Sequence, residues 1–133
     1  MRVVFLDTVG MLAIWNTADQ WHAAASAAFA DIQHGSFEFV TTSYVLVECG
    51  NAVARTAFRQ NVVDIWMEMQ RTGTLIHPSA ADERTALEAY AQRKAGQAGI
   101  VDQISFVVMQ RMEIREAFSN DRHFNAAGLI TLF

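Results

Sequence analysis

The sequence predicts an α/β fold, in which helices cover both faces of a parallel sheet. Short apolar runs rich in β-branched residues alternate with longer segments of helical periodicity. This alternation is typical of parallel sheets, because parallel neighbours need a long connection, usually a helix. The length of 133 residues suits one domain, so residues 1–133 are expected to fold as a single unit. Hydrophobic residues make up 52% of the chain, which argues for a folded core and against disorder.

Five short runs are expected to form strands. The first, Val3–Leu6, is an apolar run that ends at a carboxylate, as expected for a buried parallel strand. Gly35 and Gly73 interrupt the helical patterns that precede the next two strands. The five candidate strands are 3–6, 37–41, 74–77, 117–119 and 129–133.

Helical periodicity and capping residues predict six helices between these strands. Thr17–Gln20 has the spacing of a capping box, so a long alanine-rich helix is expected to follow it. Thr42 or Ser43 can cap the next helix, and Ser79 can cap a later one. The expected helices cover 10–15, about 20–34, about 43–55, 58–72, about 80–95 and 102–112.

The composition excludes several classes of protein. A net charge of −4 excludes a strongly basic coat protein for nucleic acid, and a single cysteine excludes a disulfide framework or a cysteine-based zinc site. The histidines lack zinc-ligand spacing, and phosphate-binding glycine motifs and the Gly-x-Ser-x-Gly motif are absent. No apolar stretch approaches a signal peptide core or the ~20 residues of a membrane span. A cytoplasmic protein without a membrane partner is therefore expected.

Four acidic residues follow strands or open helices at places that the predicted topology brings together. Asp7 follows the first strand, Glu48 lies in the helix after the second, Asp102 opens the helix before the fourth, and Asp121 follows the fourth. In open parallel sheets, ligands bind beyond the carboxyl ends of the strands. Because clustered carboxylates repel one another, such a group makes most sense as a cation site, and Mg²⁺ prefers these oxygen ligands.

Each of these acids also has an ordinary explanation when it is taken alone. Asp7 and Asp121 have neighbours typical of turns, and Asp102 is a reasonable helix N-cap. Glu48 shares a helical face with Arg55 and is compatible with a solvated stripe. The convergence of all four acids, rather than any single acid, favours the cation site.

Four short motifs contain the four acids, namely Phe5–Thr8, Thr42–Glu48, Val101–Phe106 and Phe118–Phe124. In this order they resemble the PIN domain over nearly the whole chain, and they are most similar to the VapC-like nucleases of prokaryotic toxin–antitoxin pairs. The resemblance implies a three-layer α/β/α sandwich around a central parallel sheet of four or five strands. It also implies a hydrolase, an endoribonuclease that needs one or two Mg²⁺ or Mn²⁺ ions.

The resemblance assigns a role to each acid. Asp7, Glu48 and Asp102 match the three principal metal-binding acids of the family, and Asp121 matches a more variable fourth. All four are therefore the expected catalytic and metal-binding residues. Bound divalent cations would acidify a water for in-line attack on the phosphorus and help the 3′-oxygen to leave.

Three neighbouring residues match positions that support the acids. Thr8 and Ser105 match hydroxyl positions that hold the acids or the metal's water, and Asn120 lies beside the fourth acid. The sequence departs from the family on either side of its third acid, where Val101 replaces a common hydroxyl residue and Gln103 replaces a common cysteine. Neither departure removes a metal ligand.

The proposed partners are RNA and other protein chains. Arg55, Arg59 and Arg122 lie near the acidic motifs and are candidates for phosphate contacts, although each is also compatible with a solvated or ion-paired arginine. His123 lies close enough to Asp121 to touch substrate, or serves structure. Residues 65–69 carry more apolar surface than one helical face needs, which suits core packing, a second subunit or an antitoxin peptide. The resemblance implies a small antitoxin partner and a homodimer.

The sequence therefore predicts a metal-dependent endoribonuclease, as the toxin of a type II, VapBC-like pair. Two alternatives remain open, namely a PIN-domain nuclease of RNA processing or decay, and a catalytically silent PIN module that binds RNA or protein. The net charge of −4 equals the charge of the four proposed ligands, so the remaining residues are neutral overall. RNA binding is therefore expected to depend on divalent metal more than on a broad basic surface.

Overall fold

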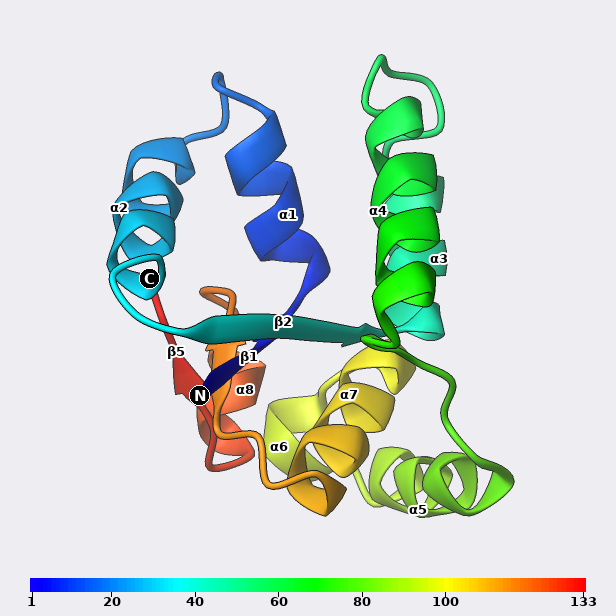
Figure 1. The fold of residues 1–133 in the computed structure, drawn as a ribbon. Helices are drawn as coiled ribbons and strands as arrows, with labels where there is room; N and C mark the ends of the chain where they lie inside the picture. Colours follow the sequence, from blue (N-terminus) through cyan, green and yellow to red (C-terminus); the bar gives the residue numbers. More distant parts are fainter.

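A five-stranded parallel sheet forms the centre of the computed structural model, which describes residues 1–133 (Figure 1). Its strand order is β3-β2-β1-β4-β5, and every neighbouring pair is parallel. The predicted parallel sheet is thus confirmed, and β1 lies at its centre, where Val4, Phe5 and Leu6 are buried. The strands are β1 Arg2–Leu6, β2 Phe37–Thr42, β3 Leu75–Ile76, β4 Glu116–Phe118 and β5 Ile130–Thr131.

Eight helices surround the sheet, two more than the sequence patterns predicted. The additional helices are a short turn before the third acidic motif and a short helix after Asp121. The fifth helix ends at Ala91 rather than near residue 95. The helices are α1 Thr8–Trp15, α2 His22–Ile32, α3 Ser43–Ala52, α4 Arg59–Thr72, α5 Ala80–Ala91, α6 Lys94–Gln97, α7 Ile100–Arg111 and α8 Arg122–Ala126.

Predicted capping residues were correct at two helices and wrong at a third. Thr42 caps α3 by accepting a hydrogen bond from the Val45 amide, and Ser79 forms a capping box at the start of α5. The capping box expected at Thr17–Gln20 does not form, and α2 begins at His22 without a side-chain cap. The side chains of Asn16 and Asp19 accept hydrogen bonds from amides two residues later, so this segment forms turns instead of a helix.

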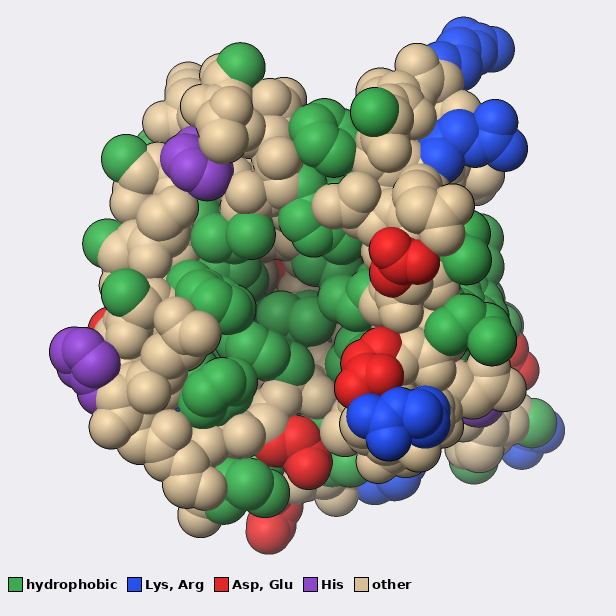
Figure 2. Space-filling view, turned by 45° about the horizontal axis from the view of Figure 1, so that its top comes forward, with side chains coloured by type: hydrophobic (Ala, Val, Ile, Leu, Met, Phe, Trp, Pro, Cys, Tyr) green, Lys and Arg blue, Asp and Glu red, His purple; other side chains and the backbone are tan.

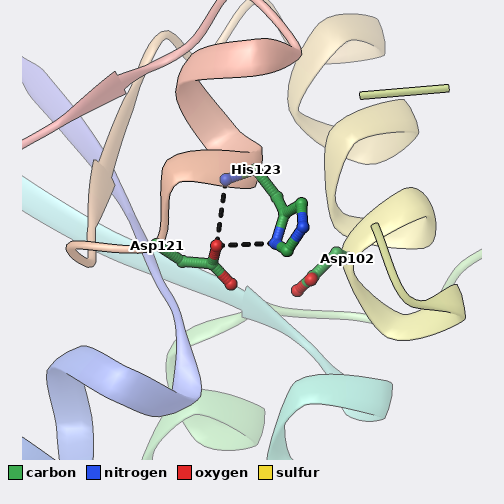
Figure 3. A group of neighbouring side chains, drawn as sticks. All are labelled: Asp102, Asp121 and His123. Atoms are coloured by element: carbon green, nitrogen blue, oxygen red, sulfur yellow. Dashed lines mark hydrogen bonds and ion pairs between the residues drawn. The ribbon is translucent and has the colours of Figure 1, made fainter. Parts of the chain in front are cut away.

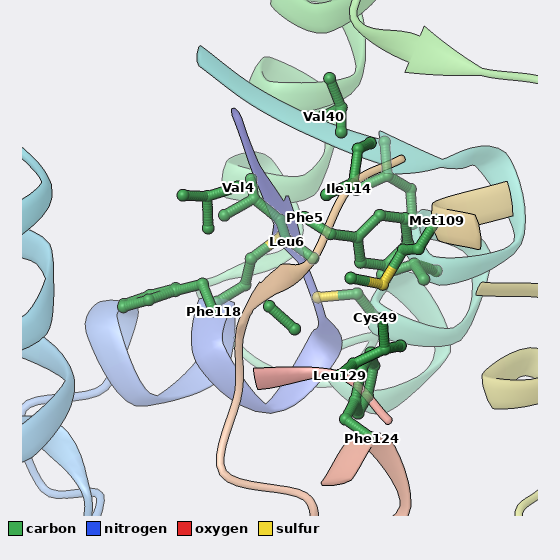
Figure 4. Close-up of a cluster of buried hydrophobic side chains, with 14 of the residues drawn as sticks. Val4, Phe5, Leu6, Val40, Cys49, Met109, Ile114, Phe118, Phe124 and Leu129 are labelled. Atoms are coloured by element: carbon green, nitrogen blue, oxygen red, sulfur yellow. The ribbon is translucent and has the colours of Figure 1, made fainter. Parts of the chain in front are cut away.

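The two faces of the sheet pack against different helices, which gives the three layers of an α/β/α sandwich. On one face, Leu6, Phe39 and Phe118 lie with side chains of α1, α2 and α4. On the other face, Phe5 packs with Met109 of α7 and with Cys49 of α3 (Figure 4). The alternation of side chains along each strand sends neighbouring residues to opposite layers.

Helix α1 approaches β4 unusually closely at Gly10. A Cβ atom built on Gly10 would overlap the carbonyl and the side chain of Phe118, so only a glycine fits. This approach places the first turn of α1, and the Asp7 that precedes it, against the end of β4. The close packing therefore helps to bring the first and fourth acidic motifs together.

No helix of the structure has the length and apolar composition needed to cross a membrane.

Candidate metal centre

Asp7 occupies the end of the central strand, and its side chain is only 3% exposed. Ser119, just beyond β4, donates a hydrogen bond of 2.7 Å from its Oγ to Asp7 Oδ2. Burial raises the pKa of Asp7 to about 6, and the Ser119 hydrogen bond partly opposes this rise. Asp7 is therefore a buried carboxyl that pairs with no basic side chain of the protein, rather than a plain turn residue.

Glu48 reaches the same edge of the sheet from α3. Thr8 Oγ1 donates a hydrogen bond of 2.7 Å to Glu48 Oε1, across 40 residues of sequence. Glu48 is half-buried and forms no ion pair with Arg55, so the solvated stripe considered for this helix face does not describe it. Thr8 therefore contacts one of the four acids directly.

Asp102 lies in the first turn of α7 and not at its N-cap, which is Gly99. The N-cap explanation for Asp102 is therefore wrong. Partial burial, and after it the charges of Asp7, Asp121 and Glu48, together raise the pKa of Asp102 to about 7. This effect on the pKa means that the four predicted acids share one electrostatic environment.

Asp121 and His123 form the part of the site that Figure 3 shows in detail. Asp121 Oδ1 accepts a hydrogen bond of 2.9 Å from the His123 amide and another of 2.8 Å from His123 Nδ1 (Figure 3). Asp121 therefore caps α8, as its turn-like sequence suggested, while its second oxygen stays free for a ligand. One ligand atom from each of Asp102, Asp121 and His123 lies within 4.8 Å of the others. Asp7 and Glu48 lie outside this closest group.

Ser119 and His123 contribute contacts that the sequence motifs did not assign. Ser119 Oγ bonds Asp7 and also accepts a hydrogen bond of 3.1 Å from the Asp121 amide, so it links two of the acids. Its place between β4 and Asp121 was visible in the sequence, but a serine after a strand is an ordinary turn residue. The sequence leaves His123 either as a substrate contact or as a structural residue, and in the structure its ring pairs with Asp121.

The other predicted supporting residues lie less directly at the acids. Ser105 Oγ donates a hydrogen bond of 3.0 Å to the Val101 carbonyl of its own helix, and not to an acid. Asn120 is half-buried between Ser119 and Asp121 and makes no side-chain hydrogen bond within the chain.

Three predicted arginines are exposed on the surface and form no ion pair. They are Arg55, Arg59 and Arg122. Arg55 and Arg59 lie at the connection between α3 and α4, the region where basic side chains project in Figure 2. Arg122 opens α8, directly after Asp121. These guanidinium groups are free to contact phosphates, which is compatible with the predicted role.

The donor set fits a hard divalent cation. Asp7, Glu48, Asp102 and Asp121 form no ion pair with Lys or Arg, and the one basic group beside them is the His123 imidazole, close to Asp121 and Asp102. Carboxylates that repel one another and lack a basic partner are stabilised by a bound cation. Oxygen ligands of this kind suit Mg²⁺ or Mn²⁺, which retain waters and bind substrate phosphates.

Comparisons with known proteins agree with the fold and the motifs. No protein-family model matches the chain. In two strains of Mycobacterium tuberculosis, the 23S rRNA-specific endonuclease VapC20 is 26% identical over 129 residues, which cover 96% of each chain. The crystal structure of Mycobacterium tuberculosis VapC20, described as a toxin that cleaves the sarcin–ricin loop, matches with a TM-score of 0.78 over 96% of both chains.

Two further solved structures share the fold at lower sequence identity. FitAcB from Neisseria gonorrhoeae is 12% identical with a TM-score of 0.64, and the match covers 98% of this chain and 96% of that one. FitAB bound to a DNA fragment is 12% identical with a TM-score of 0.67, and the match covers 96% and 92%. At this identity the two structures support the fold alone. The ordered motifs, the parallel sheet and the full-length likeness to VapC20 together support a VapC-like PIN domain.

Proposed function

We propose that the chain is a metal-dependent endoribonuclease and the toxin of a VapBC-like toxin–antitoxin pair. The observation that carries this proposal is the convergence of four carboxylates from four separate segments, with no Lys or Arg paired to any of them. The likeness to VapC20, an rRNA-specific endonuclease, supports RNA as the substrate. With RNA as the substrate, the cytoplasm is the proposed compartment.

Each residue of the site has a defined task in this proposal. Asp7, Glu48, Asp102 and Asp121 would hold one or two Mg²⁺ or Mn²⁺ ions, which supply an acidified water and neutralise charge at the phosphate. Thr8 orients Glu48 through its hydroxyl, and Ser119 orients Asp7. Because Asp7 is buried, its carboxylate keeps a fixed position. The same burial keeps bulk water away from this side of the site.

Arg55, Arg59 and Arg122 would contact the phosphates on either side of the cleaved bond. All three guanidinium groups are exposed and unpaired. A guanidinium group can donate two parallel hydrogen bonds to one phosphate, which suits this role.

RNA cleavage by the purified chain tests the proposal. Labelled RNA should be cut in Mg²⁺ and left intact in EDTA, and Asp7→Asn should lower the cleavage rate at least ~100-fold, as loss of a principal electrostatic group does. Asp64→Asn is a matched control, because Asp64 is an exposed acid on α4 that bonds only Gln60. Cleavage by Asp7→Asn at the wild-type rate would refute the assignment of the site. RNA binding without any cleavage would favour the silent module.

A groove between the sheet and helices α1, α2 and α4 is the proposed site for the antitoxin. The groove has a volume of about 280 Å³ and is lined only by hydrophobic residues, from α1, α2, α4 and the sheet. Figure 2 shows it as a hollow with hydrophobic side chains at its floor. Ile65, within the apolar stretch singled out in the sequence, lines this groove. An apolar groove between helices fits the apolar face of an amphipathic helix.

The antitoxin assignment has its own test. A small gene directly upstream should encode the partner, and its product should bind the wild-type chain and suppress both cleavage and growth arrest. Ile65→Asp should abolish this suppression, whereas Asp64→Ala, on the adjacent exposed face of α4, should not. Absence of a partner gene, together with cleavage of a defined precursor RNA, would favour the processing enzyme.

A homodimer is the proposed assembly, as the resemblance implies. Leu87 and Tyr90 are about half-exposed on α5, and Val47 is about half-exposed on α3. The Tyr44 hydroxyl donates a hydrogen bond to Glu83, which ties these two helices together. Their exposed apolar side chains would bury surface against a second copy, and Leu87→Glu should convert the dimer to a monomer in light scattering.

A further inference from the structure

The proton on the His123 ring can be assigned from its contact with Asp121. An ionised carboxylate only accepts hydrogen bonds, so His123 Nδ1, 2.8 Å from Asp121 Oδ1, is the nitrogen that carries the hydrogen. In the neutral ring the lone pair then lies on Nε2, which makes no hydrogen bond within the chain. Histidines that bind metals are characteristically oriented in this way, by donating their other nitrogen to a carboxylate.

The imidazole is held in place on more than one side. The His123 amide donates a second hydrogen bond, of 2.9 Å, to the same Asp121 oxygen. A Cβ built on Gly96 would lie 3.5 Å from His123 Cδ2, so the backbone of α6 approaches the far side of the ring. The side chain keeps 40% of its surface exposed, which leaves an approach for an ion.

The carboxylate of Asp102 faces the imidazole from α7 (Figure 3). One oxygen of Asp102, one oxygen of Asp121 and one ring nitrogen of His123 lie within 4.8 Å of one another, which places the ring beside both carboxylates. From this juxtaposition we infer that His123 Nε2 is a nitrogen ligand to a cation at this site, with Asp121 orienting the ring. The inference rests on the proposed function, because it assigns a further ligand at the same centre.

A nitrogen ligand changes which ions the site prefers. Mg²⁺ binds oxygen ligands almost exclusively, whereas first-row transition ions such as Co²⁺ accept imidazole readily. A site made only of carboxylates would show a smaller preference for Co²⁺. The ratio of the two affinities therefore reports on His123 separately from the four acids.

Two substitutions separate ligation from orientation. In His123→Asn, the amide nitrogen occupies about the position of Nδ1 and keeps the hydrogen bond to Asp121, but no atom replaces Nε2. His34→Asn is the matched control, because His34 is exposed between α2 and β2, away from the acids. Both variants retain the whole chain, and circular dichroism checks that each is folded.

Calorimetry with Co²⁺ and with Mg²⁺ should give a clear difference. His123→Asn should weaken Co²⁺ binding ~10–100-fold and Mg²⁺ binding no more than ~3-fold, and His34→Asn should change neither. Pulsed EPR of the Mn²⁺-loaded wild type should show coupling to a directly bound ¹⁴N nucleus, which is lost in His123→Asn.

Three results would overturn the inference. Absence of the ¹⁴N coupling in the Mn²⁺-loaded wild type would overturn the inference whatever the variants show. Equal weakening of Co²⁺ and Mg²⁺ binding in His123→Asn would make His123 a positioning residue for Asp121 only. Binding of neither ion by the wild type would remove the metal centre itself. Nitrogen-coupled metal binding without RNA cleavage would instead leave this inference intact and refute the proposed nuclease.

Discussion

Ser119 Oγ lies 2.7 Å from Asp7 Oδ2 and joins the carboxyl ends of two neighbouring strands, β4 and β1. The two residues are 112 positions apart in the chain, and both are buried. A hydrogen bond to a buried carboxylate favours its charged form, so Ser119 opposes the rise in the Asp7 pKa that burial causes. The charged form is the one that binds a cation.

Ser119→Ala should therefore weaken catalysis while preserving the fold. Loss of a hydrogen bond to a charged group corresponds to about 1.5–3 kcal/mol, so RNA cleavage should fall roughly 10–100-fold. The acidic limb of the pH–rate profile should move to higher pH. Ser105→Ala is the control, because its equally buried hydroxyl bonds the Val101 carbonyl of its own helix. Similar losses in both variants would contradict the role given to Ser119.

The metal-free protein should become less stable as the pH rises. The pKa of Asp7 is raised from 3.8 to about 6, so between about pH 4 and 6 the folded state binds more protons than the unfolded state. Stability therefore falls as the pH rises through this window. Because the pKa of Asp102 is raised to about 7, the loss of stability continues up to neutral pH.

Denaturant unfolding in EDTA at pH 4 and pH 8 measures this effect. Asp7→Asn removes the charge and should stabilise the metal-free protein at pH 8 by up to about 3 kcal/mol, with little change at pH 4. Mg²⁺ should restore the wild type at pH 8 but not the variant. A metal-free wild type that is more stable at pH 8 than at pH 4 would contradict the prediction.

Gly10→Ala should strongly destabilise the folded protein. The added methyl group would overlap the Phe118 carbonyl and ring, so α1 must move away from β4. Overpacking of this kind costs about 1–3 kcal/mol, and more where backbone must move. The thermal midpoint should fall sharply, whereas Gly35→Ala, which would meet nothing within 4 Å, should leave it nearly unchanged. Equal midpoints in the two variants would argue against the close approach.

Arg111→Met should destabilise the contact between α5 and α7 without altering the site. Arg111 donates two hydrogen bonds of 2.9 Å to Asp82, whose carboxylate is buried and completes the capping box of α5. Because the arginine itself is half-exposed, we expect a loss of about 1–2 kcal/mol in the free energy of unfolding.

A surface pair provides the comparison for Arg111. Arg71→Met removes an exposed pair with Glu68 within α4 and should leave the unfolding midpoint unchanged. The pKa of Asp82 is lowered by Arg111, so the difference between the wild type and Arg111→Met should shrink as the pH falls below the usual range of an aspartate. A difference that is constant with pH would contradict this pairing.

Local sequence patterns predicted the framework well, because the structures concerned depend on neighbouring residues. The apolar run before Asp7 forms β1, Thr42 and Ser79 cap their helices, and Gly73 ends α4 in a left-handed conformation. The expected cap at Thr17 failed because Asn16 and Asp19 offer the backbone competing hydrogen bonds. Composition alone did not reveal this competition.

The candidate site was predictable to the extent that topology determines it. Parallel strands end at one edge, so residues that follow them, such as Asp7 and Asp121, could be placed together from their positions. The roles of Ser119 and His123 could not, because they depend on contacts of a few ångströms between side chains. Likewise, only the structure shows that Ser105 turns back to Val101 and that Asp102 lies inside its helix.

Cys49 has a practical consequence for experiments on this chain. It is the only cysteine, it is fully buried, and burial with the nearby Glu48 and Asp7 charges raises its pKa to about 11. Thiols react with maleimides and iodoacetamides as thiolates, which this residue hardly forms at neutral pH. A cysteine introduced on the surface should thus accept a fluorophore at a single position in the otherwise wild-type chain. Antitoxin docking and RNA binding can then be followed by fluorescence, without first replacing a core residue beside Glu48.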